Sequence, residues 1–365
     1  MMKKWLLKIA IVLALIVAAL VGTAFWTDTD KALVSGHIKN ETLQTIKTDW
    51  QGTPIDQKGR FVNDEFPFLP KTISLFQWQT SRNRFKQEKD ADIPRLEVND
   101  PTNFLNSETD GILWLGHASF FIRLNGKSIL VDPIFGTPAI VKRYVEVPSP
   151  LEKIRQVDYI LLSHDHRDHT DETTLRQIAE RFPNATFLAG LGSEDILNKW
   201  KTSTNQVRTA GWFQRFDVGG AELRVFFVPV RHWSRRGLLD TNRRLWGGFV
   251  IQSSKATIYF GGDSGYGRHY KQVGELFPRI DYFIIGIGAY EPRWFMKPVH
   301  NSPEDALKAF TDSGAKALVP MHYGTFDLSD EPPNMPLKTL KAEAEKSDLN
   351  DRIRTLTINE SLEIK

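Results

Sequence analysis

The stretch VDYILLSHDHRDHTD (residues 157–171) places three histidines and three aspartates directly after an apolar run, in a chain with nine histidines in total. The short apolar run predicts a strand buried on both faces. His164 and His166 point to the same side if the backbone stays extended. Because neutral imidazoles and carboxylates are the usual ligands of zinc and similar ions, this spacing predicts a metal site rather than a solvated loop.

Three further candidate ligands stand at the ends of other apolar runs. His232 ends VFFVPVRH, Asp263 ends TIYFGGD and His322 ends ALVPMH. Each alone has an ordinary explanation, as a hydrogen-bonded core histidine, a turn-forming aspartate or a polar strand end. Open α/β sheets place their sites at the C-terminal ends of strands. Together the three residues supply the additional ligands that two metals would need.

The composition is that of an ordinary globular protein. Of the 365 residues, 41% are hydrophobic and 25% are charged. The net charge of +3 and the absence of a long basic run argue against nucleic acid as a partner. The absence of cysteine excludes disulfides, thiolate nucleophiles and cysteine-ligated zinc.

The N-terminus differs from the rest of the chain. Residues 9–26 are apolar, three lysines precede them, and Asp28 and Asp30 follow. Eighteen residues at about 1.5 Å each would span roughly 27 Å, close to the thickness of a bilayer core. Residues 1–27 are therefore predicted to be a membrane-spanning anchor with the remainder exported, on the periplasmic side in a bacterium. The alternative is a cleaved signal peptide and a secreted protein.

Mixed strands and helices are expected after a lead-in. Residues 28–110 read as an irregular segment that packs on the domain, and residues 111–365 as the domain itself. Two apolar runs between residues 111 and 135 join at Asn125-Gly126, a hairpin signal. Residues 171–183 predict a helix capped by Thr170 or Asp171, and Ser302 opens a capping box for another. Helices on both faces of the sheets, an α/β (α+β) class, are expected.

The motif HxHxDH, followed by a distant His, Asp and His, resembles the metallo-β-lactamase-fold superfamily of hydrolases over roughly residues 100–335. Longer segments, which include residues with no ligand role, narrow the resemblance, among them WLGHASFFI, HWSRRGLLDTNRRLWGGFVI and IGAYEPRWFMKPVHNSPEDALKAF. They are similar to the N-acylphosphatidylethanolamine-hydrolysing phospholipase D group and its bacterial relatives. This resemblance implies that residues 111–365 form a four-layer αββα sandwich with the site at one edge.

The resemblance also implies two bound zinc ions, although other divalent metals remain open. One metal would take His164, His166 and His232. The other would take Asp168, His169 and His322, and Asp263 would bridge both. The resemblance further implies that His300 lies beside the catalytic centre, where it protonates the leaving group or holds substrate. Asp168, Asp263 and His300 are thus the expected catalytic residues.

Several other residues are expected to support the site. His117 and Asp132 are predicted to orient ligands or to close strand ends. Arg235 is predicted to meet substrate phosphate, and so are Arg231 and Arg236 beside it. Arg167 stands inside HxHxDH where mammalian members of the group carry an aromatic residue, so acyl-chain recognition is expected to differ.

The expected reaction is phosphodiester hydrolysis by a metal-bridging hydroxide, because two cations suit the charge that develops on phosphoryl oxygens. The expected substrate is a phospholipid with a modified headgroup, cleaved on the headgroup side of phosphorus to leave phosphatidic acid. Hydrolysis of lactones or amides, including β-lactams, is the alternative within the same class. A non-catalytic envelope protein stabilised by metals is the alternative from another class.

Overall fold

The computed structural model describes residues 33–63, 65–67, 69–70, 72–94, 96–138, 141–146, 150–218, 220 and 222–364. The anchor or signal peptide expected at residues 1–27 lies outside these residues. Among the helices that the described residues form, none is both long enough and apolar enough to cross a bilayer.

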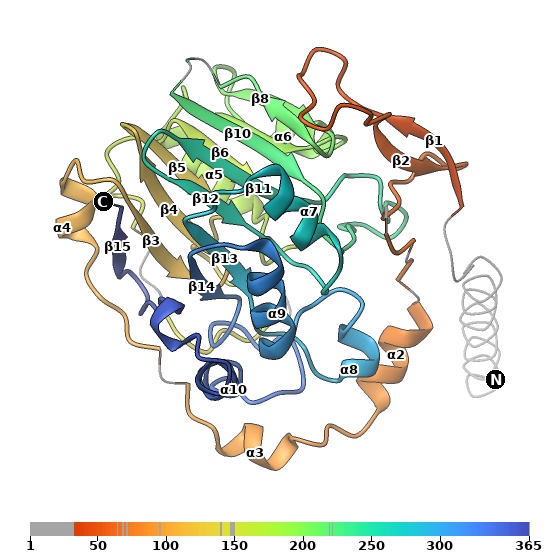
Figure 1. Ribbon diagram of the computed structural model, residues 1–365, viewed down its shortest axis with the longest axis vertical. Helices are drawn as coiled ribbons and strands as arrows, with labels where there is room; N and C mark the ends of the chain where they lie inside the picture. Colours follow the sequence, from red (N-terminus) through yellow and green to blue (C-terminus); the bar gives the residue numbers. More distant parts are fainter. Residues whose placement is uncertain are drawn as a thin grey trace, which may run out of the picture.

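Two large sheets form the centre of the domain (Figure 1). The first has the order β15 (Ser361–Glu363), β3 (Gly111–Gly116), β4 (Ser119–Leu124), β5 (Lys127–Val131), β6 (Tyr159–Leu162), β7 (Thr186–Gly190) and β8 (Gln206–Ala210). The second has the order β14 (Ala317–Met321), β13 (Tyr282–Gly286), β12 (Thr257–Phe260), β11 (Gly248–Ser253), β10 (Leu223–Val228) and β9 (Gln214–Phe216). Strands β5 to β8 and strands β12 to β14 run parallel.

Alternating side chains divide the first sheet between two cores. Ile112 and Trp114 of β3 belong to the core shared with the second sheet, whereas Leu113 and Leu115 pack in the core that includes α5 (Glu172–Arg181) and α6 (Glu194–Trp200). This alternation follows from the two-residue period of a strand. On the second sheet, α7 (His269–Leu276), α9 (Pro303–Ser313) and α10 (Met335–Lys346) form the outer layer. The predicted mixed α/β sandwich, with helices outside two sheets, is therefore confirmed.

Capping and turn residues in the sequence determine where several helices and strands begin or end. Asp171 caps α5 by accepting a hydrogen bond from the Thr174 backbone N–H at 2.8 Å. Ser302 and Asp305 form the predicted capping box of α9, and Gly314 ends that helix at φ 66°. Asn125 and Gly126 both have positive φ, at 55° and 72°, which gives the tight hairpin between β4 and β5.

The first apolar run is not one strand. The sequence indicated two strand-like runs joined at Asn125-Gly126, but the run before that turn is itself a hairpin of β3 and β4. Gly116 and His117 have φ of 95° and 51°, so the chain reverses between them and Ser119. Apolar residues on both sides of GHA conceal this turn, because β3 and β4 are buried along their whole length.

The lead-in contains more regular structure than its sequence indicates. It forms a two-stranded sheet of β1 (Val34–Ile38) and β2 (Thr53–Asp56), followed by α2 (Thr72–Thr80), α3 (Lys86–Ala91) and α4 (Thr102–Asn106). The Asn63 side-chain amide donates to the backbone oxygen of His232 at 2.7 Å, and Lys89 bonds Asp327. The part of the lead-in around Asn63 therefore lies at the edge of the domain that carries the candidate ligand His232.

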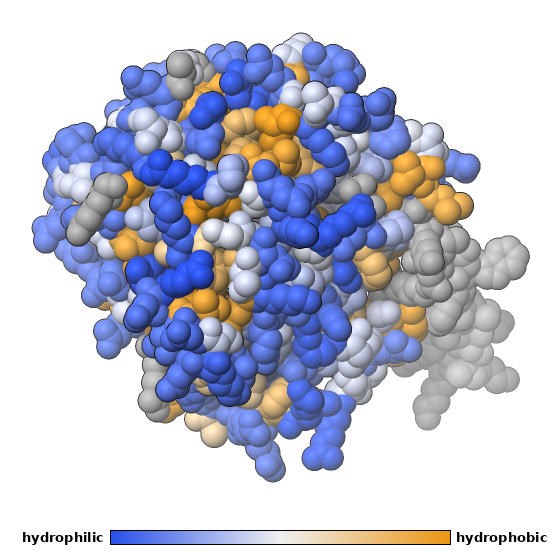
Figure 2. All heavy atoms as spheres, viewed as in Figure 1, coloured by the Kyte–Doolittle hydropathy of each residue, from blue (hydrophilic) through white to orange (hydrophobic). Residues whose placement is uncertain are grey.

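The remaining elements are α8 (Arg293–Met296), which contacts α2, and the 3-10 helix η1 (Asn350–Arg352). On the face shown in Figure 2, hydrophilic side chains predominate and apolar ones form separate patches. This is the ordinary surface of a globular domain.

Candidate metal centre

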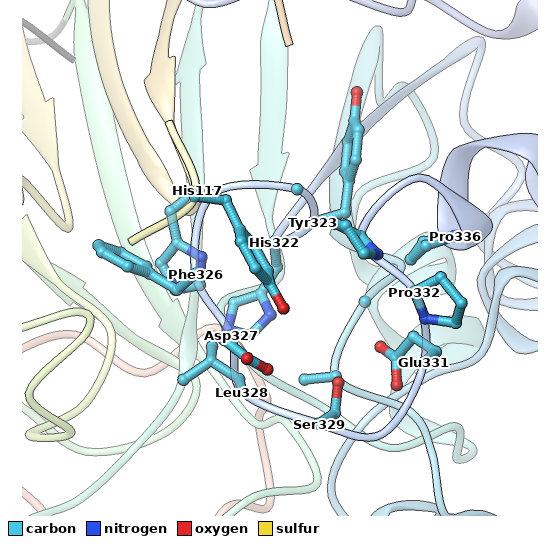
Figure 3. A pocket seen from close by; sticks show the side chains of 15 residues that line it. His117, His322, Tyr323, Phe326, Asp327, Leu328, Ser329, Glu331, Pro332 and Pro336 are labelled. Carbon is cyan, nitrogen blue, oxygen red and sulfur yellow. The ribbon is translucent and has the colours of Figure 1, made fainter. Parts of the chain in front are cut away.

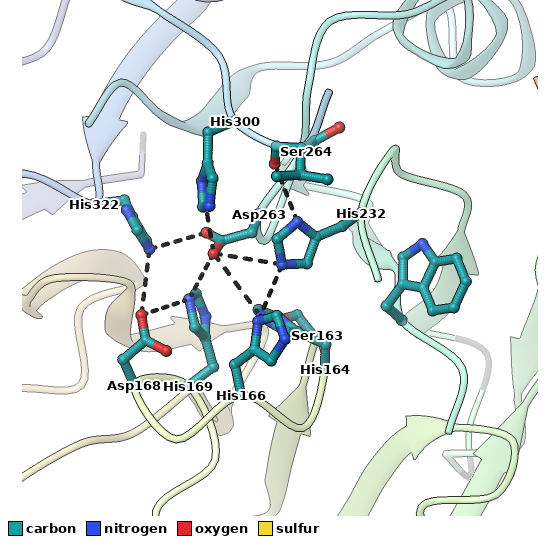
Figure 4. A network of polar contacts seen from close by, with 12 residues as sticks. Ser163, His164, His166, Asp168, His169, His232, Asp263, Ser264, His300 and His322 are labelled. Carbon is teal, nitrogen blue, oxygen red and sulfur yellow. Dashed lines mark hydrogen bonds and ion pairs between the residues drawn. The ribbon is translucent and has the colours of Figure 1, made fainter. Parts of the chain in front are cut away.

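Strand ends bring the candidate ligands together. Asp132 follows β5, His164 follows β6 by two residues, and His322 follows β14 directly. Because the C-terminal ends of neighbouring parallel strands meet at one edge of a sheet, residues far apart in sequence converge there. Figure 4 shows the imidazole rings from both sheets pointing toward the carboxylate of Asp263, which follows β12.

Three residues at this edge have left-handed backbone conformations. The φ angles are 51° for His117, 42° for Asp132 and 63° for His322. Residues other than glycine rarely adopt such angles, and they concentrate where a functional site dictates the direction of the chain. Here each angle turns the chain sharply at the end of its strand.

One group of candidate ligands consists of His164, His166, His232 and Asp263, whose ligand atoms all lie within 4.8 Å of one another. His166 Nδ1 lies 2.9 Å from His164 Nε2 and 3.1 Å from His232 Nε2. Asp263 Oδ2 lies 3.9 and 3.8 Å from those two Nε2 atoms. Nitrogen ligands around a tetrahedral zinc ion stand roughly 3.3 Å apart, so this group has the size of a metal cage.

The second group consists of Asp168, His169, His322 and His117, again within 4.8 Å. Asp168 Oδ2 lies 3.6 Å from both His169 Nε2 and His322 Nε2. Asp263 also reaches this group, since its oxygens lie 3.2 Å from His169 Nε2 and 3.1 Å from His322 Nε2. Asp263 therefore stands between the two groups, where a bridging carboxylate was expected.

Hydrogen bonds fix which ring nitrogen of His164, His169 and His232 faces the centre. His169 Nδ1 donates to Asp132 at 2.8 Å, and His232 Nδ1 donates to the Val299 carbonyl at 3.0 Å. His164 Nδ1 lies 2.9 Å from Ser163 Oγ, which itself donates to Asp132. With the proton held on Nδ1, the lone pair of Nε2 is directed at the centre, as metal ligation requires.

His117 both contacts a candidate ligand and is a potential ligand itself. Its Nε2 lies 3.1 Å from Asp168 Oδ2, consistent with the predicted orienting role. It also stands inside the second group of potential ligand atoms. Burial lowers the pKa of His117 to about 3, so the ring is neutral near pH 7.

The centre contains buried polar atoms that no hydrogen bond satisfies. Among the described residues, His166 Nε2, His169 Nε2, Asp263 Oδ1 and both ring nitrogens of His322 have no partner in hydrogen-bond geometry. Unsatisfied buried polar atoms are rare in folded proteins, because each costs about 1–3 kcal/mol. A cluster of them on facing side chains fits a site built for cations.

The charges of the centre favour the same conclusion. Burial opposes protonation of His322, but the Asp263 and Asp168 carboxylates together outweigh it and raise the pKa of His322 to about 9. Burial would likewise raise the pKa of Asp263, but His169 and His322 hold it well below its usual range. Without a metal, protonated His169 and His322 supply the positive charge beside the Asp263 and Asp168 carboxylates, and divalent cations would supply it in their place. Nitrogen and oxygen donors without sulfur suit zinc, iron or manganese.

A cleft opens from the centre. It has a cavity volume of about 360 Å³, and Asp168, Asp263, His300 and His322 are among the residues that line it. Its other walls are mainly apolar and come from five parts of the chain: Pro70, Leu75, Trp78, Pro138, Val141, Trp233, Ala289, Phe295, Met296, Val299 and Leu328. Ligand sites of proteins are typically such apolar clefts with a few convergent polar groups.

Three of the predicted substrate-binding residues line this cleft. Arg167 is exposed at its rim, and Arg235 and His300 also contribute to its wall. His300 Nδ1 lies 3.9 Å from Asp263 Oδ2. Its backbone oxygen accepts a hydrogen bond from Arg293, and burial lowers its pKa to about 4.

Arg231 and Arg236 are placed elsewhere. The Arg231 guanidinium donates to the Pro298 and Tyr266 carbonyls. The Arg236 guanidinium donates to the backbone oxygens of Asp165 and Thr170. Neither residue lines the cleft, so both fasten loops instead of facing a phosphate.

Two residues that the sequence reasoning missed support the HxHxDH loop. Asp165 is buried between His164 and His166, and its Oδ2 pairs with Arg244 at 2.9 Å. Asp165 Oδ1 accepts the backbone N–H of Arg235 at 2.9 Å. Asp165 could have been singled out as a further acidic residue inside the motif. No sequence pattern around Arg244 indicates that it pairs with Asp165.

A second, smaller cavity of about 20 Å³ lies beside the centre (Figure 3) and shares His322, Ala289 and Leu328 with the cleft. His117 and His322 border it on one side, and Ser329, Glu331 and Pro332 on the other. Its size is roughly that of one water molecule, so it is too small for a substrate.

Comparison with known proteins agrees with this architecture. Residues 127–323, more than half of the chain, match the family described as the beta-lactamase superfamily domain. The N-acyl-phosphatidylethanolamine-hydrolyzing phospholipase D 1 of Caenorhabditis elegans is 30% identical over 280 residues, which cover 72% of this chain and 78% of that protein. A metal-dependent hydrolase of Caldivirga maquilingensis is 33% identical over 218 residues, 58% of this chain and 82% of that protein.

Among solved structures, the metallo hydrolase Igni18 of Ignicoccus hospitalis matches 70% of this chain and 99% of its own, with a TM-score of 0.53 and 21% identity. That likeness concerns the fold. The sequence matches, together with the two sheets and the clustered ligands, show that the chain belongs to the β-lactamase superfamily of metal-dependent hydrolases and resembles its N-acylphosphatidylethanolamine-hydrolysing phospholipase D group.

Proposed function

We propose that the protein is a binuclear metal-dependent phosphodiesterase that hydrolyses N-acylphosphatidylethanolamine-like lipids. The observation that carries this proposal is the joining of two features in one cleft. Asp168, Asp263 and His322 line it beside the candidate metal centre, and apolar side chains form most of the rest of its lining. A substrate with a phosphodiester at one end and acyl chains at the other matches that division.

The clustered histidines and aspartates form two groups that would each hold one cation. His164, His166 and His232 would hold one, and Asp168, His169 and His322 the other, with Asp263 between them. The chemistry that two divalent cations supply at such a site is a lowered pKa of coordinated water and stabilisation of phosphoryl oxygens. Zinc is the proposed metal, because its ligands are typically imidazole and carboxylate in hydrolases.

The chain's own residues would bind and orient the lipid. Arg235 and Arg167 supply positive charge at the cleft, which suits the anionic phosphodiester. Apolar walls would exclude bulk water around the reacting phosphorus. In the balanced reaction, water adds to phosphorus, the bond from phosphorus to the headgroup oxygen breaks, and that oxygen takes up a proton. His300, whose Nδ1 lies 3.9 Å from Asp263 Oδ2, would hold or protonate this oxygen.

The test compares three substrate classes on the full chain supplied with zinc. N-acylphosphatidylethanolamine in mixed micelles, soluble bis-p-nitrophenyl phosphate, and nitrocefin with an acyl-homoserine lactone represent lipid diesters, simple diesters and the amide or lactone alternative. Mass spectrometry should detect phosphatidic acid and an N-acylethanolamine in equal amounts, and Asp263→Ala should abolish both. Faster turnover of nitrocefin or the lactone, without phosphatidic acid, would refute the proposal in favour of the alternative.

We further propose that residues 1–27 tether the protein to a membrane with the catalytic domain exported. The apolar run at residues 9–26, flanked by lysines on one side and aspartates on the other, supports this. The full chain should stay in the membrane fraction after alkaline carbonate extraction, with the domain accessible to protease from outside the cytoplasm. Release as a shortened soluble protein would instead favour a signal peptide.

A further inference from the structure

Two consecutive leucines project into solvent from the loop that carries His232. Leu238 is 89% exposed and Leu239 is 96% exposed, the highest values among the large hydrophobic residues of the described chain. Single exposed leucines are common on protein surfaces. An adjacent pair with almost no intramolecular contact is different, because neither side chain contributes to the stability of the fold.

The loop that presents these leucines is held in a defined shape. Asp240 Oδ1 accepts the backbone N–H groups of Gly237 at 2.7 Å and Arg236 at 3.2 Å. Asp240 Oδ2 accepts a hydrogen bond from Arg244 at 2.7 Å. Leu238 and Leu239 therefore lie between Gly237 and Asp240, which are joined by a hydrogen bond. The shape of the loop thus keeps both leucine side chains exposed.

The same loop forms part of the cleft. Arg235, three residues before Leu238, lines the cleft, and His232 lies in the candidate metal centre. Its neighbour Trp233 also lines the cleft. A surface that buries the leucines would consequently lie close to the mouth through which substrate reaches the metals.

The charge around the leucines favours one kind of partner. Residues 231–239 contain three arginines and no acidic residue, although Arg231 and Arg236 also fasten loops through backbone oxygens, and the nearby Asp240 is paired with Arg244. Apolar side chains that project beside cationic ones are typical of segments that sit at the interface of an anionic bilayer. A protein partner would require about 800 Å² of complementary surface on each side, far more than two side chains at a loop tip supply.

We propose that the loop of residues 233–240 docks the catalytic domain on an anionic lipid surface by inserting Leu238 and Leu239, so that the cleft opens onto the bilayer. This docking is separate from any tether at the N-terminus. It rests on the proposed function, since a lipid substrate gives the docking its purpose, but binding of the loop is measurable without turnover.

The absence of cysteine from the chain allows a site-specific test. Leu239→Cys in the full chain is labelled with the environment-sensitive fluorophore nitrobenzoxadiazole. Lys341→Cys, at an exposed position of α10, is the matched control. Both proteins are mixed with phosphatidylethanolamine–phosphatidylglycerol vesicles and with neutral phosphatidylcholine vesicles. Bulk vesicle binding is not the readout, because the apolar residues 9–26 would bring any variant to a membrane.

The label at position 239 is expected to brighten and shift to the blue with anionic vesicles, less with neutral ones, while the label at 341 stays unchanged. No change at 239, equal changes at both positions, or a change that grows with protein concentration in the absence of vesicles would overturn the inference. The last result would identify a second copy of the chain as the partner.

The double variant Leu238→Ser/Leu239→Ser provides the functional readout. Turnover of the lipid substrate in vesicles should fall about tenfold or more, since two leucines no longer leave water. Turnover of soluble bis-p-nitrophenyl phosphate should stay the same. If both substrates are inert with every variant, the proposed function fails while the fluorescence result still decides whether the loop docks.

Discussion

His169 Nδ1 donates a hydrogen bond to Asp132 Oδ2 at 2.8 Å, and neither side chain is exposed to solvent. Asp132 follows β5 and His169 lies beyond β6, so the bond joins the ends of two neighbouring parallel strands. The same carboxylate accepts the backbone N–H and the hydroxyl of Ser163. Asp132 thus has three donors to satisfy, and only a carboxylate can accept from all of them.

Asp132→Asn is expected to weaken metal binding by about 10–100-fold, the usual effect of removing a hydrogen-bond partner of a ligating histidine. Asparagine tolerates the left-handed conformation at φ 42°, so the backbone should survive. Its amide NH₂ must, however, face either His169 or Ser163, both of which donate. Titration of zinc-loaded protein with a competing chelator measures the loss. Asp281→Asn, which removes a similar carboxylate that accepts the Thr257 N–H, is the control and should bind zinc normally.

Arg244→Ala is expected to destabilise the fold by about 3 kcal/mol, as is typical when one partner of a buried ion pair is removed. Arg244 pairs with Asp165, Asp195 and Asp240, and its side chain is 8% exposed. Asp165 would be left buried without its counterion. Urea unfolding followed by circular dichroism measures the free energy of unfolding.

Asp195→Ala is the matched control for Arg244→Ala. The Asp195 side chain is 51% exposed, so its pair with Arg244 should contribute less than about 1 kcal/mol. Equal losses for the two variants would contradict a central role for the Asp165–Arg244 pair.

Much of the fold follows from local sequence signals. The capping box of Ser302 and Asp305 and the Asn125-Gly126 turn involve residues close together in the chain, so their patterns are visible without a structure. The candidate ligands were also predictable, because strong apolar runs precede each of them. The hairpin at His117 was not, since apolar residues continue on both sides of the turn.

Hydrogen bonds and ion pairs between residues far apart in the chain could not be predicted from the sequence. Asn63 bonds the His232 backbone across 169 residues, and Arg244 pairs with Asp165 across 79. No local pattern specifies such partners, because the choice depends on how two sheets bring their loops together. For the same reason the arginines beside His232 look alike in sequence, although Arg235 lines the cleft and Arg231 fastens a loop.

Trp78→Ala is expected to lower kcat/KM for a long-chain lipid diester about tenfold and to leave that for bis-p-nitrophenyl phosphate unchanged. Trp78 lines the cleft, stacks on Phe295 with ring centroids 5.2 Å apart, and donates its indole N–H to Asp330. Its loss removes an apolar wall that only a substrate with an acyl chain would contact, worth about 1.4 kcal/mol or more.

Phe76→Ala is the control for Trp78→Ala on the same helix. Phe76 is 61% exposed and does not line the cleft, so lipid turnover in detergent micelles should be retained. Kinetics with diesters of increasing acyl length measure both variants. An unaltered preference for chain length in Trp78→Ala would show that the lead-in helix plays no part in substrate selection.

Removal of metal is expected to lower the melting temperature of the wild-type protein by about 5 °C or more, since an ion held at 100 times its Kd stabilises the folded state by about 2.7 kcal/mol. Scanning calorimetry with and without a chelator measures the shift. Asp263→Ala should show a much smaller shift, because Asp263 belongs to one ligand group and lies within 3.2 Å of His169 and His322 of the other. His300→Ala should keep the full shift if His300 serves the substrate, and should lose part of it if His300 is a ligand, since it also lies near Asp263 and His322. An identical melting temperature with and without chelator would contradict the metal centre itself.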